Sequence, residues 1–123
     1  MDQDNKSFSE ALKRRIYKLI LEIIQFIGTL DTRDPVCKVV IDQLIRCSTS
    51  IGANYVEAIA GSSRKDFTNF LSHSLKSANE TKFWLALLRD SGKGNKEKIN
   101  QFLIELQELT KILATSIRTL RAK

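Results

Sequence analysis

The stretch "DPVCKVVIDQLIRCSTSIGANYVEAIAG", from Asp34 to Gly61, decides the fold because it has the pattern of one long helix. Asp34 followed by Pro35 is typical of a helix start, with an acidic N-cap and proline at the first helical position. Apolar or small residues then recur at helical spacings, at Val36, Val40, Leu44, Cys47, Ile51 and Ala58. We therefore predict a helix that buries one face.

Three further helices are predicted from signals of the same kind. Capping-box patterns occur at Ser7–Glu10 and Ser63–Asp66, and Gly94–Asn95 precedes the last apolar pattern. The four predicted helices cover residues 8–28, 35–60, 64–91 and 96–121. Because the connections are short, we expect one all-α domain over residues 1–123, an antiparallel up-down-up-down four-helix bundle.

The composition is that of a globular chain, and its positive net charge has two interpretations. With 42% hydrophobic and 28% charged residues among 123, the chain can bury a single modest core. The net charge of +6 and a pI near 9.5 favour RNA, DNA or an anionic surface as partner. A basic surface that only confers solubility explains the charge equally well.

The cysteines and the N-terminal segment indicate a cytoplasmic protein. Cys37 and Cys47, ten residues apart on one predicted helix, are separated by roughly 15 Å and cannot form a disulfide. They are interpreted as reduced core thiols. The polar N-terminus has no signal-peptide pattern, and no apolar run approaches about 20 residues, so no membrane segment is expected.

Neither catalysis nor a bound metal or cofactor is predicted. His73 is the one histidine and has no nucleophile partner at a helical spacing. The chain contains no Glu-x-x-His pair of the kind that binds two metal ions inside a helix bundle. The "GKGN" at residues 92–95 lacks the rest of a phosphate-binding loop and is interpreted as a turn between helices.

Basic residues gather at one end of the predicted bundle. The start of the first helix, the turn before the third and the end of the fourth share that end. It holds five acidic and ten basic residues, which accounts for five of the six net positive charges. The basic residues are Lys6, Lys13, Arg14, Arg15, Lys18, Arg64, Lys65, Arg118, Arg121 and Lys123. The predicted nucleic-acid contacts are Lys13, Arg14, Arg15, Lys18, Arg118 and Arg121. A simpler explanation covers Arg118, Arg121 and Lys123, which also complement the dipole at the C-terminal end of the last helix. No aromatic residue is expected among these basic residues, so base stacking is not predicted.

A polar stripe on the second helix is interpreted as a structural seam. Its members are Arg46, Ser50, Asn54 and Glu57, and Glu80 of the third helix is expected to pair with Arg46. Asn54 and Glu57 are expected to cap the following turn. Ser48 and Gly52 lie on the opposite border, where small residues allow another helix to approach closely.

Exposed apolar residues predict self-association. Tyr17 and Leu21 widen the apolar face of the first helix beyond the arc that a surface helix needs. Phe83 and Leu87 point away from the apolar stripe of the third helix. Such residues typically mark an interface, so these four are the predicted oligomer contacts.

Three motifs resemble those of a known family. They are Ser50, Ile51, Asn54 and Glu57 on the second helix; Lys65, Asp66 and Phe67 at the start of the third; and Ser77, Glu80 and Thr81 before "FWLALL". Together they resemble the four-helix-bundle family encoded in intervening sequences of bacterial 23S ribosomal RNA genes. The resemblance covers residues 45–92 well and the flanking helices in pattern only. One departure is Ala58, where the family usually has glycine.

The resemblance implies a non-enzymatic helical bundle that assembles into a homo-oligomeric ring, with a pentamer favoured. The family is similar to the accessory variability determinant of diversity-generating retroelements, a basic pentameric barrel that binds nucleic acid and a reverse transcriptase. The expected partners are therefore further copies of the chain, structured RNA or DNA, or a protein such as a reverse transcriptase.

We predict a basic accessory protein that binds RNA or DNA through its positively charged end. The alternative is a protein-interaction scaffold that docks a partner protein through its exposed apolar helix faces.

Overall fold

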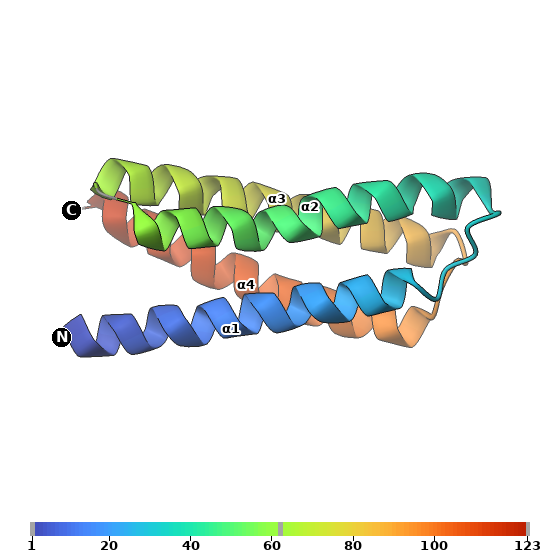
Figure 1. Cartoon of the computed structure of the whole chain (residues 1–123), viewed down its shortest axis with the longest axis horizontal. Helices are drawn as coiled ribbons and strands as arrows, with labels where there is room; N and C mark the ends of the chain where they lie inside the picture. The colour runs from blue at the N-terminus through green and yellow to red at the C-terminus, as the bar shows by residue number, and fades with distance from the viewer. Residues whose placement is uncertain (1, 62, 123) are drawn as a thin grey trace.

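The chain folds into four α-helices (Figure 1). The computed structural model describes residues 2–61 and 63–122, apart from the side chains of residues 2 and 3, and within these ranges it contains no strand. The helices are α1 (Asp2–Ile27), α2 (Pro35–Ala60), α3 (Arg64–Asp90) and α4 (Lys96–Ala122). The all-α class and the four predicted helices are confirmed. None of the described helices combines the length and the apolar character needed to cross a membrane.

Helix α1 begins at Asp2 rather than near Phe8 as predicted. Ser7 therefore lies inside the helix and is not its N-cap. No glycine or proline interrupts the first two turns, and Asp4 adds a negative charge near the helix start, where the helix dipole favours it. As a consequence Lys13 and Lys18 lie roughly 17–24 Å along α1, near its middle and not at its end.

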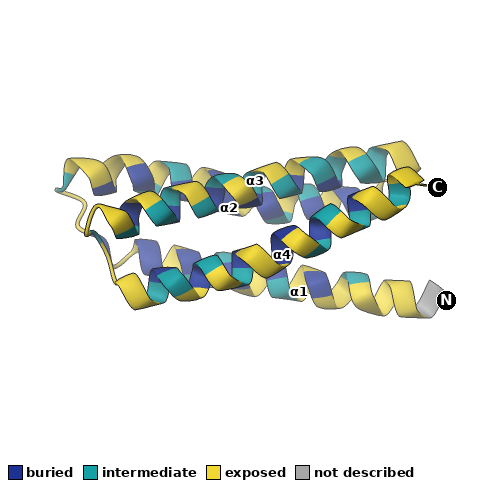
Figure 2. Cartoon of the chain, turned by 180° about the vertical axis from the view of Figure 1, so that it is seen from behind, coloured by how far each residue is buried: buried dark blue, intermediate teal, exposed yellow. Residues whose placement is uncertain are grey.

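The helices are not packed against one another equally. The start of α1, the end of α2, the start of α3 and the end of α4 lie at one end of the bundle (Figure 1). Helices α2 and α3 share the most extensive contact, and α1 and α4 share the least. Toward the end that holds the start of α1, α4 diverges from α1 (Figures 1 and 2). Helix α1 is therefore the helix that contacts its neighbours least.

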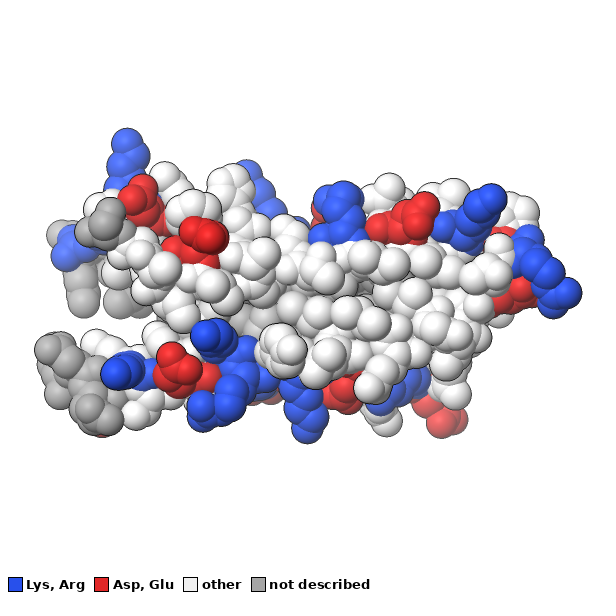
Figure 3. Space-filling view, viewed as in Figure 1, with Lys and Arg blue, Asp and Glu red and all other residues white. Residues whose placement is uncertain are grey.

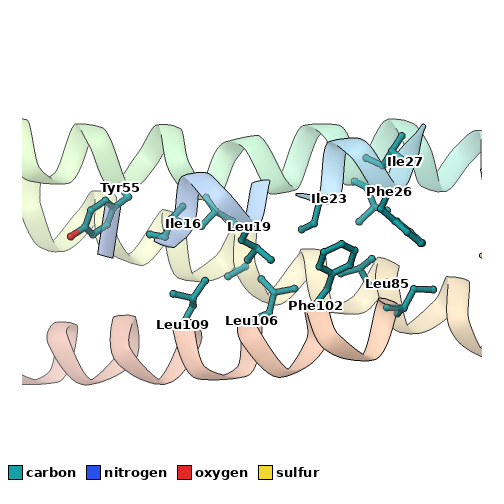
Figure 4. Close-up of a cluster of buried hydrophobic side chains, with 14 of the residues drawn as sticks. Ile16, Leu19, Ile23, Phe26, Ile27, Tyr55, Leu85, Phe102, Leu106 and Leu109 are labelled. Carbon is teal, nitrogen blue, oxygen red and sulfur yellow. The ribbon is translucent and has the colours of Figure 1, made fainter. Parts of the chain in front are cut away.

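Apolar side chains from all four helices fill the interior. Buried positions follow the inner side of each helix (Figure 2). Ile23, Leu85 and Leu106 are fully buried and come from three different helices (Figure 4). Phe26 and Phe102 pack edge to face, with ring centroids 5.5 Å apart. These contacts form one continuous core, as the helical spacing of the apolar residues predicts.

Small and hydroxyl-bearing residues bring α2 and α3 close together. Ala78 is fully buried. The hydroxyl of Ser74 donates to the carbonyl oxygen of Ile51 at 2.8 Å, and the hydroxyl of Thr81 donates to Cys47 Sγ at 3.2 Å. Each bond satisfies a buried polar group and fixes the distance between the two backbones.

Asp34 joins the start of α2 to the connection between α3 and α4. Its Oδ1 accepts from the backbone N–H groups of Val36 and Cys37 at 2.9 and 3.1 Å, as the predicted N-cap. Its Oδ2 accepts from Lys93 Nζ at 2.5 Å. The hydrogen bond from Lys93, with smaller effects of the two amides, holds the pKa of Asp34 below its usual value.

Asp34→Asn is expected to flatten the acid dependence of stability. Asparagine caps helices as well as aspartate does, so the variant removes the charge and keeps the cap. A carboxylate with a lowered folded-state pKa stabilises the fold above its unfolded pKa, and this stabilisation is lost as the pH falls through the folded pKa. The difference in melting temperature between wild type and variant should therefore be largest near about pH 7 and shrink as the pH falls below the ordinary aspartate pKa of about 3.9. Thermal unfolding followed by circular dichroism measures it.

The exposed Asp42 on the same helix provides the control, because Asp42→Asn removes the same charge without removing a helix cap or an ion pair with a described residue. A melting-temperature difference for Asp34→Asn that does not vary with pH would contradict the assignment.

Candidate functional site

Lys13, Arg14 and Lys18 form an exposed surface on α1, which we call the α1 basic surface. None of the three takes part in an ion pair with the described residues. Figure 3 shows basic side chains gathered along α1 at the lower edge of the view. Because these residues lie near the middle of α1, the surface is on the side of the bundle and not at its end.

Arg15 is directed toward α4, unlike its neighbour Arg14. Its Nε and Nη2 donate to the two carboxylate oxygens of Glu105 at 2.9 and 2.8 Å, and Nη2 also lies 2.9 Å from Glu108 Oε1. The hydrogen bond from Glu105 raises the pKa of Arg15 above its usual value. Two carboxylates offset the charge of Arg15, so the structure assigns it to holding α1 against α4.

The structure does not bring Arg118 and Arg121 to the α1 basic surface. Both lie in the last two turns of α4, the part that diverges from α1 (Figure 2). Arg118 lines a shallow depression between α3 and α4 with Leu75 and Asn79, and its Nη2 donates to Thr115 Oγ1 at 3.2 Å. Lys123 lies outside the described residues. The predicted basic end is thus divided between separate faces.

Tyr17 lies among the cations of the α1 basic surface. Its side chain is 65% exposed. On a helix it is adjacent to Lys13 and Arg14, four and three residues earlier, and directly precedes Lys18. The expectation that no aromatic accompanies the basic residues is therefore wrong. Helical spacing contains this signal, because Tyr17 lies on one helix face with Lys13 and Arg14, but the same spacing also places it beside the apolar face of α1.

An apolar groove of about 500 Å³ runs between α1 and α2 beside Tyr17. Its lining consists of Lys13, Ile16, Tyr17, Ile20, Thr49, Gly52, Ala53, Tyr55, Val56 and Glu57. A Cβ atom on Gly52 would lie 2.8 Å from Ile20 Cδ1, so the glycine allows α1 to approach α2 there. Figure 3 shows the surface hollowed between these two helices. Sequence reasoning did not predict this groove.

The polar stripe on α2 is mainly a contact with α3. The predicted ion pair between Arg46 and Glu80 is present, and Trp84 Nε1 also donates to Glu80 Oε2 at 3.2 Å. The hydroxyls of Ser50 and Ser77 are hydrogen-bonded at 2.9 Å across the two helices. These contacts support the structural interpretation of the seam.

Asn54 and Glu57 differ from the rest of the stripe. Asn54 Nδ2 donates to the backbone and side-chain oxygens of Ser50, both at 2.9 Å, and so stays on its own helix. The expectation that it caps the turn after α2 is wrong, because the cap of α3 is Ser63. Glu57 is exposed and lines the groove beside α1.

The four predicted oligomer contacts are all exposed and lie on two helices. Tyr17 and Leu21 are 65% and 43% exposed on α1. Phe83 and Leu87 are 58% and 42% exposed on α3, where Phe83 packs edge to face on Trp84. Their role in self-association stays a prediction.

The groups that could take part in catalysis or metal binding are scattered. Among residues 2–61 and 63–122, no three His, Cys, Asp or Glu side chains are arranged to hold a metal ion. His73 is exposed on α3. Burial raises the pKa of both Cys37 and Cys47, which makes their thiols poor nucleophiles.

The sequence matches the 23S rRNA-intervening sequence protein family over residues 9–115. The chain belongs to this family. Its structure is similar to that of a protein of unknown function from the S23 ribosomal protein family of Bacteroides thetaiotaomicron. That likeness has 31% sequence identity and a TM-score of 0.77, and it covers 89% of this chain and 97% of the other. No protein with a curated description matches the chain.

In this 23S rRNA-intervening sequence protein, only some of the predicted basic contacts lie within the residues that match the family. The α1 basic surface, Tyr17 and the groove all lie within residues 9–115, whereas Arg118 and Arg121 lie beyond them. The S23-family relative is described as a protein of unknown function.

Proposed function

We propose that this protein is a non-enzymatic accessory factor of the cytoplasm that binds nucleic acid through the α1 basic surface. The observation that carries the proposal is the exposure of Lys13, Arg14 and Lys18 on one side of α1, without an ion-pair partner among the described residues. Cations that are free of carboxylate partners can exchange bound counterions for phosphates, and this exchange drives non-specific nucleic-acid binding.

The size of the surface suits a short stretch of phosphate backbone. Lys13 and Lys18 are five residues apart, which is about 8 Å along the helix axis. The net charge of +6 adds attraction at longer range and steers a polyanion toward the protein. Arg118 and Arg121 contribute to that field from α4 but are not part of the proposed contact.

Assembly of several copies would multiply this field. We propose that the four helices form an antiparallel up-down-up-down bundle and that copies associate into a ring, with a pentamer favoured. The exposed apolar residues on α1 and α3 support association, because a head-to-tail contact between two different faces generates a ring when its rotation closes. A partner protein such as a reverse transcriptase is the alternative occupant of these faces.

The neighbours Arg14 and Arg15 provide a matched test of the proposed function. Arg14→Gln and Arg15→Gln change the net charge equally, but only Arg14 belongs to the α1 basic surface. Arg14→Gln should weaken binding about three- to tenfold near 0.1 M salt and lower the slope of log K against log salt by about 0.7–0.9. Arg15→Gln should leave that slope unchanged and lower the melting temperature instead, because Glu105 and Glu108 lose their shared cation.

Fluorescence anisotropy with labelled structured RNA and duplex DNA across a salt series measures both variants. Equal losses of affinity and slope in the two variants would show that net charge alone matters. Binding that does not depend on salt would contradict the proposed phosphate contacts.

A further inference from the structure

We propose that the groove between α1 and α2 accepts an unpaired nucleobase that stacks on Tyr17. The preferred ligand is then a single-stranded or looped nucleic acid and not a continuous duplex. This inference rests on the proposed function, because the α1 basic surface supplies the phosphate contacts that hold the strand beside the groove.

The exposed position of Tyr17 beside basic residues supports stacking of a base. Tyr17 is 65% exposed. Its neighbours on the helix face are Lys13 and Arg14 on the preceding turn and the apolar Ile20 and Leu21 on the following turn, and Lys18 is the next residue in the chain. An aromatic ring among cations is the arrangement that binds unpaired strands, because phosphates meet the cations while a base stacks on the ring. A paired base cannot stack on Tyr17 in this way, because its faces are already covered by neighbouring bases within a duplex.

The shape and lining of the groove also support a base site. Its volume of about 500 Å³ is within the range of small-molecule sites, so a single base fits. Ile16, Ile20 and Val56 provide apolar contact for the faces of a base. Gly52 has no side chain, and Ile20 Cδ1 lies where a Cβ atom there would be crowded, so this glycine lets α1 lie close to α2 at the floor of the groove.

Polar groups among the lining residues can form hydrogen bonds with a base and contact its phosphate. Thr49 and Glu57 are exposed on the α2 side of the groove, and Lys13 is exposed on the α1 side. A carboxylate and a hydroxyl can accept hydrogen bonds from the amino groups of a base edge, and a lysine can contact its phosphate. Glu57 belongs to the Ser-Ile-x-x-Asn-x-x-Glu motif, but it makes no ion pair with a described residue.

Charge complementarity selects this occupant over a second copy of the chain. The groove needs a ligand that is flat and apolar in one part and anionic in another, which is the chemistry of a nucleotide. Lys13, Arg14 and Lys18 beside this groove attract an anionic group, which a nucleotide supplies, and association of copies would use other faces. Tyr17 is therefore assigned to the base site, and Leu21, Phe83 and Leu87 remain the predicted oligomer contacts.

The test compares a single-stranded RNA of about 12 nucleotides with a blunt duplex that has the same number of phosphates. Tyr17→Leu should weaken single-strand binding about 5- to 150-fold, as the loss of one stacked base does, and change duplex binding less than about twofold. Tyr17→Phe should retain wild-type binding because it keeps the ring. Phe8→Leu is the matched control, since it removes an exposed aromatic of α1 that lies outside both the groove and the predicted oligomer contacts, and it should change neither affinity.

Two further measurements locate the contact. Ultraviolet cross-linking to a strand that contains 5-bromouracil should label the peptide that carries Tyr17, and labelling elsewhere would overturn the proposal. Light scattering should give Tyr17→Leu the mass of the wild type, whereas a smaller mass would assign Tyr17 to a subunit contact.

The outcomes separate this inference from the proposed function. The triple variant Lys13→Gln, Arg14→Gln, Lys18→Gln tests the basic surface. If it loses affinity for both nucleic acids and Tyr17→Leu loses none, the α1 basic surface is supported and the base site is wrong. If the triple variant binds both as the wild type does, the proposed function itself fails.

Discussion

Ile51→Ala is expected to lower the free energy of unfolding by about 2–5 kcal/mol. The side chain of Ile51 has no exposed surface and lies within the core. Alanine would remove apolar contacts and leave a cavity that the rigid pairing of α2 with α3 prevents from closing. A loss of this size is a large part of the about 5–15 kcal/mol that stabilises a typical domain.

Ile104→Ala provides the matched control for Ile51→Ala. Ile104 lies on α4 and is 71% exposed, so the same chemical change should alter the free energy of unfolding by less than about 0.5 kcal/mol. Urea denaturation followed by circular dichroism measures both variants. Similar losses in the two variants would contradict the core described here.

Ala78→Leu is expected to destabilise the fold by about 1–3 kcal/mol, although it adds apolar surface. Ala78 is fully buried in the contact between α2 and α3. The hydrogen bond from Ser74 to the Ile51 carbonyl oxygen fixes the backbone distance near this position. A leucine side chain can fit only if the two helices separate and lose such bonds.

Ala11→Leu tests whether the effect of Ala78→Leu depends on the helix contact. Ala11 is exposed on α1 and lies outside the groove, so a leucine there should change stability little. Denaturant unfolding of both variants gives the comparison. A neutral or stabilising Ala78→Leu would show that α2 and α3 can adapt to larger side chains.

The helix boundaries could be predicted where the signals act locally. Asp34 and Pro35 predicted the start of α2 correctly because an N-cap bonds within the next three residues. The start of α1 could not be predicted in the same way. A Ser-x-x-Glu pattern such as Ser7–Glu10 is compatible with the interior of a helix, and the chain continues the helix outward because no residue there interrupts it.

The candidate site could be predicted only in part, because it depends on how helices are rotated and spaced. Arg14 and Arg15 are adjacent in the sequence, yet they point about 100° apart around α1, and the position of Glu105 decides which of them is paired. The groove depends on the spacing of α1 and α2, which no single-helix pattern contains. The seam of Arg46 and Glu80 was predictable because the short connection between α2 and α3 determines their register.

The uneven packing of the helices implies that the native state does not open uniformly. Amide hydrogens are expected to exchange with solvent first in α1, which shares the least contact with its neighbours, and last in the closely paired α2 and α3. The α1 basic surface and one wall of the groove therefore belong to the part of the fold that opens at the lowest free energy. A ligand held between α1 and α2 would slow that exchange, so local protection, and not global stability alone, would report its binding.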